Sequence, residues 1–233
     1  MSLPEKGWQA ARARIAAAER IAGRASNTVV LLAVSKTFPA ADVRSVYALG
    51  QRAFGENYVQ EAAAKRAALA DLPDIEWRLI GPLQANKAKL AAETFDWVET
   101  VDRLKIAERL GTLRPAARGP LNVLVQVNAS GEATKSGVAP AEAVALARDV
   151  SRLPGLTLRG IMGIPEPTQD PAVQRAQFGV LRACFDACKS AGLAVDTLSM
   201  GMSADLETAI AEGATEVRIG TAIFGARVIG SVS

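Results

Sequence analysis

Lys36 follows an apolar run, an arrangement that could support amine chemistry. Residues 29–34 are all Val, Leu or Ala, which predicts a strand buried on both faces. Alternation along that strand would place Leu32, Val34 and Lys36 on one face. Desolvation favours the neutral amine of lysine, which attacks aldehydes. Taken alone, Lys36 is better explained as a charged strand end that reaches water.

Two stretches near the C-terminus contain residue types suited to an anion. Ser203 in GMSAD is predicted to cap a helix that begins at Ala204, whose first amides would face a bound anion. Gly220 and Thr221 would add further amides and a hydroxyl. Parallel barrels often bind phosphate after their seventh and eighth strands. The alternative is an ordinary helix cap and an ordinary turn.

Arg218 lies two residues before Gly220 and is expected to point the same way along a strand. A guanidinium beside a pyridine nitrogen would keep that nitrogen unprotonated, because arginine does not give up its proton. The alternative for Arg218 is a salt bridge to Glu216 or Glu56. A lysine opposite a phosphate site indicates a phosphorylated aldehyde, either the sugar phosphate of a Schiff-base aldolase or pyridoxal 5′-phosphate (PLP).

Hydrophobic periodicity predicts eight strands that alternate with helices behind one additional N-terminal helix. The first expected strand ends at Lys36. The other seven span 52–55, 76–80, 97–101, 121–127, 156–162, 197–200 and 216–219. The expected helices span 4–24, 40–49, 58–69, 85–94, 103–113, 140–152, 172–191 and 204–212, with a short one from 222. Eight such units predict a single-domain α/β protein, a (β/α)₈ TIM barrel over residues 1–233. An open doubly wound sheet is the alternative, although no GxGxxG follows the first strand.

Composition narrows the possible functions. The 233 residues are 49% hydrophobic and 22% charged, with a net charge of +3, and no motif or basic stripe indicates a nucleic-acid partner. The absence of histidine removes His-dependent triads and His metal sites. Cys184 and Cys188 are expected to be buried on one helical face rather than to bind metal. A charged N-terminus and no long apolar stretch predict a cytoplasmic protein without membrane contact.

Several motifs occur in order along nearly the whole chain. They are LLAVSKTFP (31–39), FGENYVQE (54–61), WRLIGPLQANK (77–87), VNASGEATKSG (127–137), LRGIMGIP (158–165), LSMGMSADLETAI (198–210) and VRIGTAIFG (217–225). Together they resemble the PLP homeostasis protein family, also called the YggS or PROSC family. That resemblance implies a barrel similar to the N-terminal domain of alanine racemase, without its second domain.

The resemblance also implies a cofactor and a set of binding residues. Lys36 would form the Schiff base with PLP, and Arg218 would face the pyridine nitrogen. The phosphate would be held by Ser203, Gly220 and Thr221, and the ring would be lined by Asn57 and Met202. The family commonly has histidine where this chain has Arg78.

The resemblance further implies a PLP carrier in vitamin B6 homeostasis, associated with amino-acid and keto-acid metabolism, rather than an enzyme with catalytic residues. Its possible partners would be apo PLP-dependent enzymes. The alternative is a PLP-dependent amino-acid racemase of low activity, for which Tyr58 is the residue to examine, although packing at a helix start is the favoured role. Lys135 could receive PLP during transfer, but a solvated loop lysine is favoured. Without the dimer-forming second domain, a monomer is expected.

Overall fold

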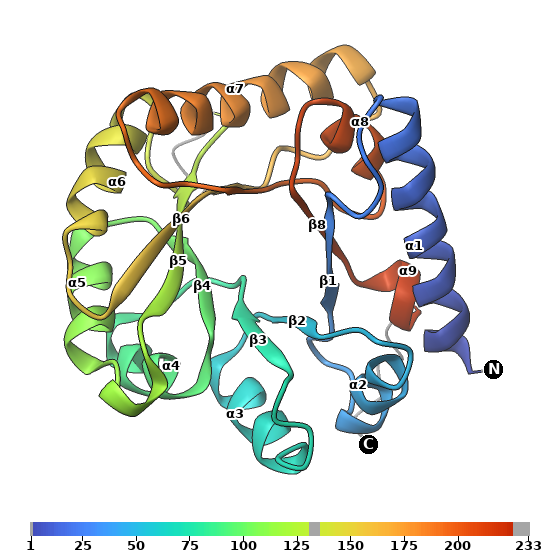
Figure 1. Ribbon diagram of the computed structural model, residues 1–233, viewed down its shortest axis with the longest axis horizontal. Coiled ribbons are helices and arrows are strands. Elements are labelled where there is room, and N and C mark those ends of the chain that lie inside the picture. The colour runs from blue at the N-terminus through green and yellow to red at the C-terminus, as the bar shows by residue number, and fades with distance from the viewer. Residues whose placement is uncertain (1, 131–135, 226–233) are drawn as a thin grey trace, which may run out of the picture.

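The computed structural model describes residues 2–130 and 136–225 (Figure 1). Within these residues, parallel strands pair in the order β1 to β8 and close into a barrel. The strands are β1 Val30–Val34, β2 Ala53–Glu56, β3 Glu76–Leu79, β4 Trp97–Val101, β5 Leu121–Val127, β6 Leu156–Gly163, β7 Thr197–Ser199 and β8 Glu216–Ile219. The predicted barrel is confirmed, and the open doubly wound alternative is wrong.

Helices surround the barrel (Figure 1). They are α1 Leu3–Ile21, α2 Ala40–Tyr47, α3 Val59–Ala68, α4 Ala88–Thr94, α5 Leu104–Leu113, α6 Ala143–Ser151, α7 Pro171–Ser190, α8 Leu206–Ala211 and α9 Thr221–Phe224, with 3₁₀ turns at Ala85–Lys87, Ala116–Arg118 and Pro140–Glu142. Among the described residues, no helix combines the length and apolar character needed to cross a bilayer.

The additional N-terminal helix α1 has a well-defined start and a fixed end. Ser2 and Glu5 form a reciprocal capping box at its first turn, and its buried side packs against α8 and α9 (Figure 1). Near its end, the Glu19 carboxylate accepts hydrogen bonds from the amides of Thr28 and Val29 at 2.7 and 2.8 Å. The helix is therefore tied to the start of β1.

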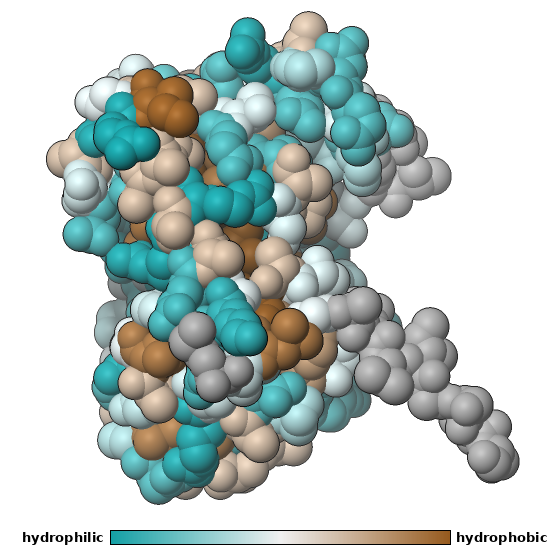
Figure 2. All heavy atoms as spheres, turned by 90° about the vertical axis from the view of Figure 1, so that its right-hand side faces the viewer, coloured by the Kyte–Doolittle hydropathy of each residue, from teal (hydrophilic) through white to brown (hydrophobic). Residues whose placement is uncertain are grey.

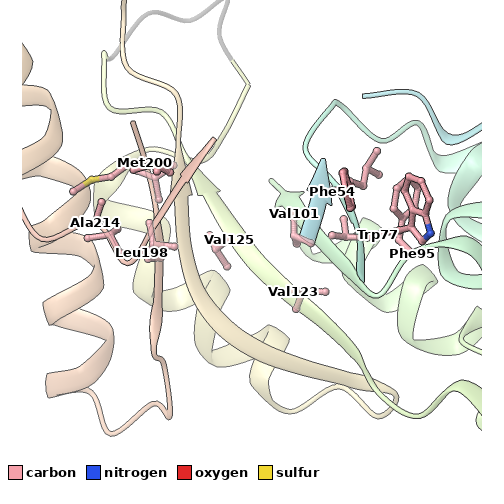
Figure 3. Packing of buried hydrophobic residues seen from close by; sticks show 14 of the residues in the cluster. Phe54, Trp77, Phe95, Val101, Val123, Val125, Leu198, Met200 and Ala214 are labelled. Atoms are coloured by element: carbon pink, nitrogen blue, oxygen red, sulfur yellow. The ribbon is translucent and has the colours of Figure 1, made fainter. Parts of the chain in front are cut away.

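The strand residues alternate between the barrel interior and the helical layer. Leu32 and Val34 belong to a small interior cluster with Ala53 and Ile80. The other face of the strands contributes to the large core beneath the helices. Figure 3 shows part of that core, with the rings of Phe54 and Trp77 6.2 Å apart between centroids. The alternation predicted for the first strand is confirmed.

Two boundaries that matter for function differ from the prediction. β1 ends at Val34, so Lys36 lies in the turn that follows and not within the strand. The helix expected from Ala204 begins at Leu206, and its N-cap residue is Asp205. The Asp205 carboxylate accepts a 2.6 Å hydrogen bond from the Met202 amide, which keeps residues 202–205 in a turn. The prediction that Ser203 caps this helix is therefore wrong.

Candidate functional site

The seven residues predicted to bind the cofactor line one pocket of about 360 Å³ at the carboxyl ends of the strands. They are Lys36, Asn57, Met202, Ser203, Arg218, Gly220 and Thr221. Apolar side chains of Val34, Ile80 and Ile164 complete the walls. A larger hollow of about 450 Å³ lies at the amino ends of the strands, where Val30, Arg52 and Glu76 line it, and Lys36 does not reach it. The chemistry-bearing residues therefore converge on the carboxyl-end pocket.

Lys36 enters this pocket from the turn after β1, and its neighbours hold that turn in place. Thr37 has a φ of 69°, in the left-handed region that threonine rarely adopts. The Thr37 amide donates a 2.5 Å hydrogen bond to the Glu61 carboxylate on α3. This contact offsets the backbone strain at Thr37 and so holds the turn that carries Lys36.

A second lysine supports the same turn from the helical side. The Lys65 ammonium on α3 lies 2.6 Å from the Ser35 carbonyl, 2.7 Å from Glu56 and 2.7 Å from Glu61. The Ser35 hydroxyl donates to Glu56 at 2.6 Å. Burial raises the pKa of Glu56 above its ordinary value, although the charge of Lys65 opposes that effect. Sequence analysis missed this buried group, and the only available signal was the repeated charge of Glu56, Glu61 and Lys65 beside the FGENYVQE motif.

The side of the pocket that was predicted to bind an anion consists of two backbone turns, one carrying Ser203 and the other carrying Thr221. No described residue accepts a hydrogen bond from the amides of Ser203, Ala204 or Thr221, so these donors are available to a ligand. Gly201 has a φ of 93°, and a Cβ there would approach the Ala209 Cβ to 2.4 Å, so only glycine fits. A Cβ at Gly220 would lie 3.3 Å from the Val34 carbonyl, which makes glycine the best fit to this close packing.

Helix α1 contacts the first of these turns directly. The Arg14 guanidinium donates a 3.0 Å hydrogen bond to the Ser203 carbonyl. It also makes two 2.9 Å hydrogen bonds to the Glu207 carboxylate on α8. A bidentate arginine of this kind fixes geometry as well as charge. The N-terminal helix therefore helps to position the turn that carries Ser203, a contact that spacing in the sequence did not reveal.

Arg218 forms the floor of the pocket and is buried on β8. Its guanidinium donates to the Ser199 hydroxyl at 2.7 Å and to the Gly163 carbonyl at 2.8 Å. Burial lowers the pKa of Arg218, and the nearby carboxyl groups of Glu99 and Glu216 oppose that effect. Among the described residues, Arg218 has no direct ion pair with Glu216 or Glu56, so the salt-bridge alternative is wrong. Glu56 pairs with Lys65 instead.

Asn57 reaches the pocket because the ends of β2 and β3 approach closely. A Cβ at Gly81 would lie 2.3 Å from the Asn57 carbonyl, so glycine at position 81 permits this approach. The neighbouring Tyr58 side chain is 58% exposed and lines a different hollow with Gln84 and Lys87. The expectation that Tyr58 packs at the helix start is therefore wrong, and Tyr58 does not line the pocket of Lys36 either.

The site combines features that suit a phosphorylated aromatic aldehyde. A lysine, two sets of amide donors and a buried arginine surround a pocket with apolar walls. Of its lining residues described here, only Lys36 and Arg218 carry an ionisable side chain. A guanidinium donates hydrogen bonds and accepts none, which suits an unprotonated ring nitrogen. The residues present therefore fit PLP.

The fold and the site together define the class of protein. The family model described as "Alanine racemase, N-terminal domain" matches residues 9–228. The chain is 59% identical over 219 residues to the pyridoxal phosphate homeostasis protein of Pseudomonas aeruginosa, covering 94% of each chain. It is 50% identical over 218 residues to the Escherichia coli K12 protein of the same name, covering 93% of each. The chain belongs to the pyridoxal phosphate homeostasis protein family, within the class that has the alanine racemase N-terminal domain.

A solved structure of the same family contains the cofactor. PipY of Synechococcus elongatus PCC7942, solved with PLP bound, superposes with a TM-score of 0.79 at 41% sequence identity. The match covers 89% of this chain and 99% of PipY. Because the chain spans almost the full length of these relatives, the family assignment applies to the whole barrel.

Proposed function

We propose that this protein binds PLP, holds it as a Schiff base on Lys36 and releases it in PLP homeostasis. The observation that carries this proposal is the convergence of all seven predicted residues on one pocket. Family membership and the PLP-bound structure of PipY support the choice of cofactor. The sugar phosphate of an aldolase, left open by the residues alone, is not the ligand that these relatives indicate.

In this proposal each part of the pocket has a distinct role. Lys36 supplies the amine, and the Ser203 and Thr221 hydroxyls and the Gly220 turn bind the phosphate. Arg218 donates to the ring nitrogen, and Asn57 and Met202 line the ring. Bound PLP supplies the electrophilic aldehyde carbon. Because Arg218 keeps the ring nitrogen unprotonated, the ring would be a weak electron sink.

We propose a carrier rather than an enzyme with substantial turnover. Racemisation requires acid–base groups on both faces of the substrate. The described lining of the pocket includes one lysine and no tyrosine, and Tyr58 lies outside it. An adjoining hollow of about 330 Å³ shares Asn57, Ile80 and Ile164 with the pocket and would admit an amine that takes PLP away. Apo PLP-dependent enzymes are the proposed recipients.

The remaining expectations are proposals about the protein in solution. We propose a cytoplasmic monomer that functions as one PLP-binding domain over residues 1–233. In Figure 2, brown hydrophobic residues on the visible face are separated by teal hydrophilic ones, an arrangement consistent with a monomer. Light scattering should give a mass near 24.4 kDa, and twice that value would contradict the monomer. The role suggested for Lys135 lies outside the described residues.

An absorbance titration with PLP tests the proposal. A near-ultraviolet to visible band should develop in the wild-type protein and should be absent in Lys36→Ala. The holo-protein incubated with L-alanine or L-serine should leave their chirality unchanged. Loss of chirality would favour the low-activity racemase, and no band in the wild type would contradict PLP binding.

A further inference from the structure

Five buried polar residues form a cluster beneath the pocket floor, here called the core cluster. They come from four different strands: Arg78 on β3, Glu99 on β4, Ser199 on β7, and Glu216 and Arg218 on β8. All five are at least 95% buried. Buried ionisable groups require partners, so the hydrogen bonds within this cluster must be internally consistent.

The Ser199 hydroxyl has three polar neighbours and only one hydrogen of its own. Arg218 donates to the Ser199 oxygen at 2.7 Å. The carboxylate oxygens of Glu99 and Glu216 lie 2.8 and 2.9 Å from the same oxygen. Ser199 can donate to one of these oxygens but not to both. The other carboxyl group can bond to Ser199 only if it brings its own proton.

The surroundings of the two acids determine which one carries that proton. Arg78 forms an ion pair with Glu216. The same guanidinium nitrogen is 3.6 Å from the nearest Glu99 oxygen, which has no hydrogen-bond partner among the described residues. Burial, followed by repulsion from Glu216, raises the pKa of Glu99 well above its ordinary value.

The charged groups on the neighbouring elements bear on whether Glu99 or Glu216 carries the proton. Glu76 on β3 pairs with Arg78 at 2.5 Å, so Arg78 is already shared between two carboxylates. Arg159 on β6 lies over the Trp97 ring, as Arg78 does, and pairs with Asp196 at 2.6 Å. Asp205, on the turn before α8, is the remaining carboxyl group near Arg218. Arg78 and Arg218 both act to lower the pKa of Glu99, but burial and the charge of Glu216 outweigh them.

We propose that Glu99 is protonated in the folded protein at neutral pH and donates a hydrogen bond within the core cluster. Glu99 is thus a positioning residue: through Ser199 it fixes the orientation of the Arg218 guanidinium toward the pocket. This inference rests on the proposed function only where it concerns PLP.

A neutral Glu99 also determines the charge at the floor of the pocket. Because Glu216 pairs with Arg78, the bonds that Arg218 makes to described residues go to a hydroxyl and a backbone carbonyl. Its positive charge is therefore not cancelled by a direct carboxylate partner. An ionised Glu99 would cancel that charge and weaken the hydrogen bonds that Arg218 offers to a ring nitrogen or an anion.

Two matched variants, Glu99→Gln and Glu216→Gln, test the assignment. Glutamine has the shape of a protonated glutamate and no charge, so Glu99→Gln should be at least as stable as the wild type at neutral pH. Glu216→Gln removes the ion-pair partner of Arg78 and should clearly lower both the melting temperature and the urea midpoint. Thermal and urea unfolding of the PLP-free protein measure both effects. Equal losses in the two variants would overturn the proposal.

Infrared spectroscopy of the PLP-free protein gives a direct readout of the proton. The wild type should show the carbonyl stretch of a protonated carboxyl group at neutral pH, and this band should vanish in Glu99→Gln. The folded-state pKa of Glu99 is raised, so the wild type should lose stability as the pH rises toward that pKa, and Glu99→Gln should lack this loss. Absence of the infrared band from the wild type would overturn the proposal.

A PLP titration then tests the effect on Arg218. Glu99→Gln should bind PLP with a Kd within about twofold of the wild type, and Glu216→Gln should bind about tenfold more weakly. If the wild type bound no PLP, the proposed function would fail. The infrared band and the unfolding data would still decide whether Glu99 holds a proton.

Discussion

Lys36 depends on its two sequence neighbours for its place in the pocket. The Ser35 carbonyl and the Thr37 amide are both connected to Lys65, the first directly and the second through Glu61. This arrangement lets the chain leave β1 through a strained turn while Lys36 remains at the pocket.

The hydroxyls of Ser203 and Thr221, which are proposed to bind the phosphate, give a prediction at the same scale. Ser203→Ala and Thr221→Val should each raise the Kd for PLP about tenfold, because a hydrogen bond to a charged group contributes about 1.5–3 kcal/mol. Absorbance titration measures the change.

Pyridoxal, which lacks the phosphate, is the matched control ligand. Its Kd should be nearly the same in the wild type and in both variants. A parallel loss of pyridoxal affinity would show that these hydroxyls shape the pocket in general and do not bind the phosphate.

Among the structural elements, α1 has a role that the barrel fold does not require. Arg14 connects it to both the Ser203 carbonyl and Glu207. The salt bridge is partly exposed, with side-chain exposures of 39% and 49%, so its contribution to stability should be small. Its main effect is on the geometry of the turn after β7.

Arg14→Ala should therefore raise the Kd for PLP several-fold while the melting temperature changes little. Arg182→Ala is the matched control, because Arg182 forms an equally exposed salt bridge with Asp186 on α7, away from the pocket. Equal PLP affinity in both variants would contradict a positioning role for α1.

Helix α3 contributes the buried Lys65, and its removal should affect the whole fold. Lys65→Met leaves Glu56 buried without its cation, which should cost about 3–5 kcal/mol in the free energy of unfolding. Lys89→Met is the control, since the Lys89 side chain is 73% exposed beside Glu93. Urea unfolding should separate the two variants clearly; similar midpoints would contradict the structural role of Lys65.

The elements show where sequence reasoning succeeds and where it fails. The apolar strands and their alternation with helices were predictable, because burial on both faces gives continuous hydrophobic runs such as residues 29–34. The start of α8 was not, because the Asp205 side chain rather than Ser203 organises the turn. Local preference identified a capping residue type, whereas the hydrogen bond from the Met202 amide to Asp205 decides where the helix begins.

Across the whole molecule, the barrel brings residues that are up to 185 positions apart to one pocket, from Lys36 to Thr221. Motif order and the family resemblance were sufficient to predict this set from the sequence. Arg14 and the core cluster were not predictable, because each joins elements distant in sequence. Lys65 pairs with the nearby Glu56 and Glu61, but its burial and its contact with the Ser35 carbonyl appear only in the fold. Arg78 illustrates this, since only the fold places it beside Glu216 and over the Trp97 ring.

The most direct measurement of the central claim is borohydride reduction of the PLP-loaded protein, followed by peptide mass mapping. We expect one reduced pyridoxyl group per chain, on the peptide that contains Lys36, and none in Lys36→Ala. A label found chiefly on another lysine, Lys135 included, or no label at all, would contradict the assignment of Lys36 as the residue that holds PLP.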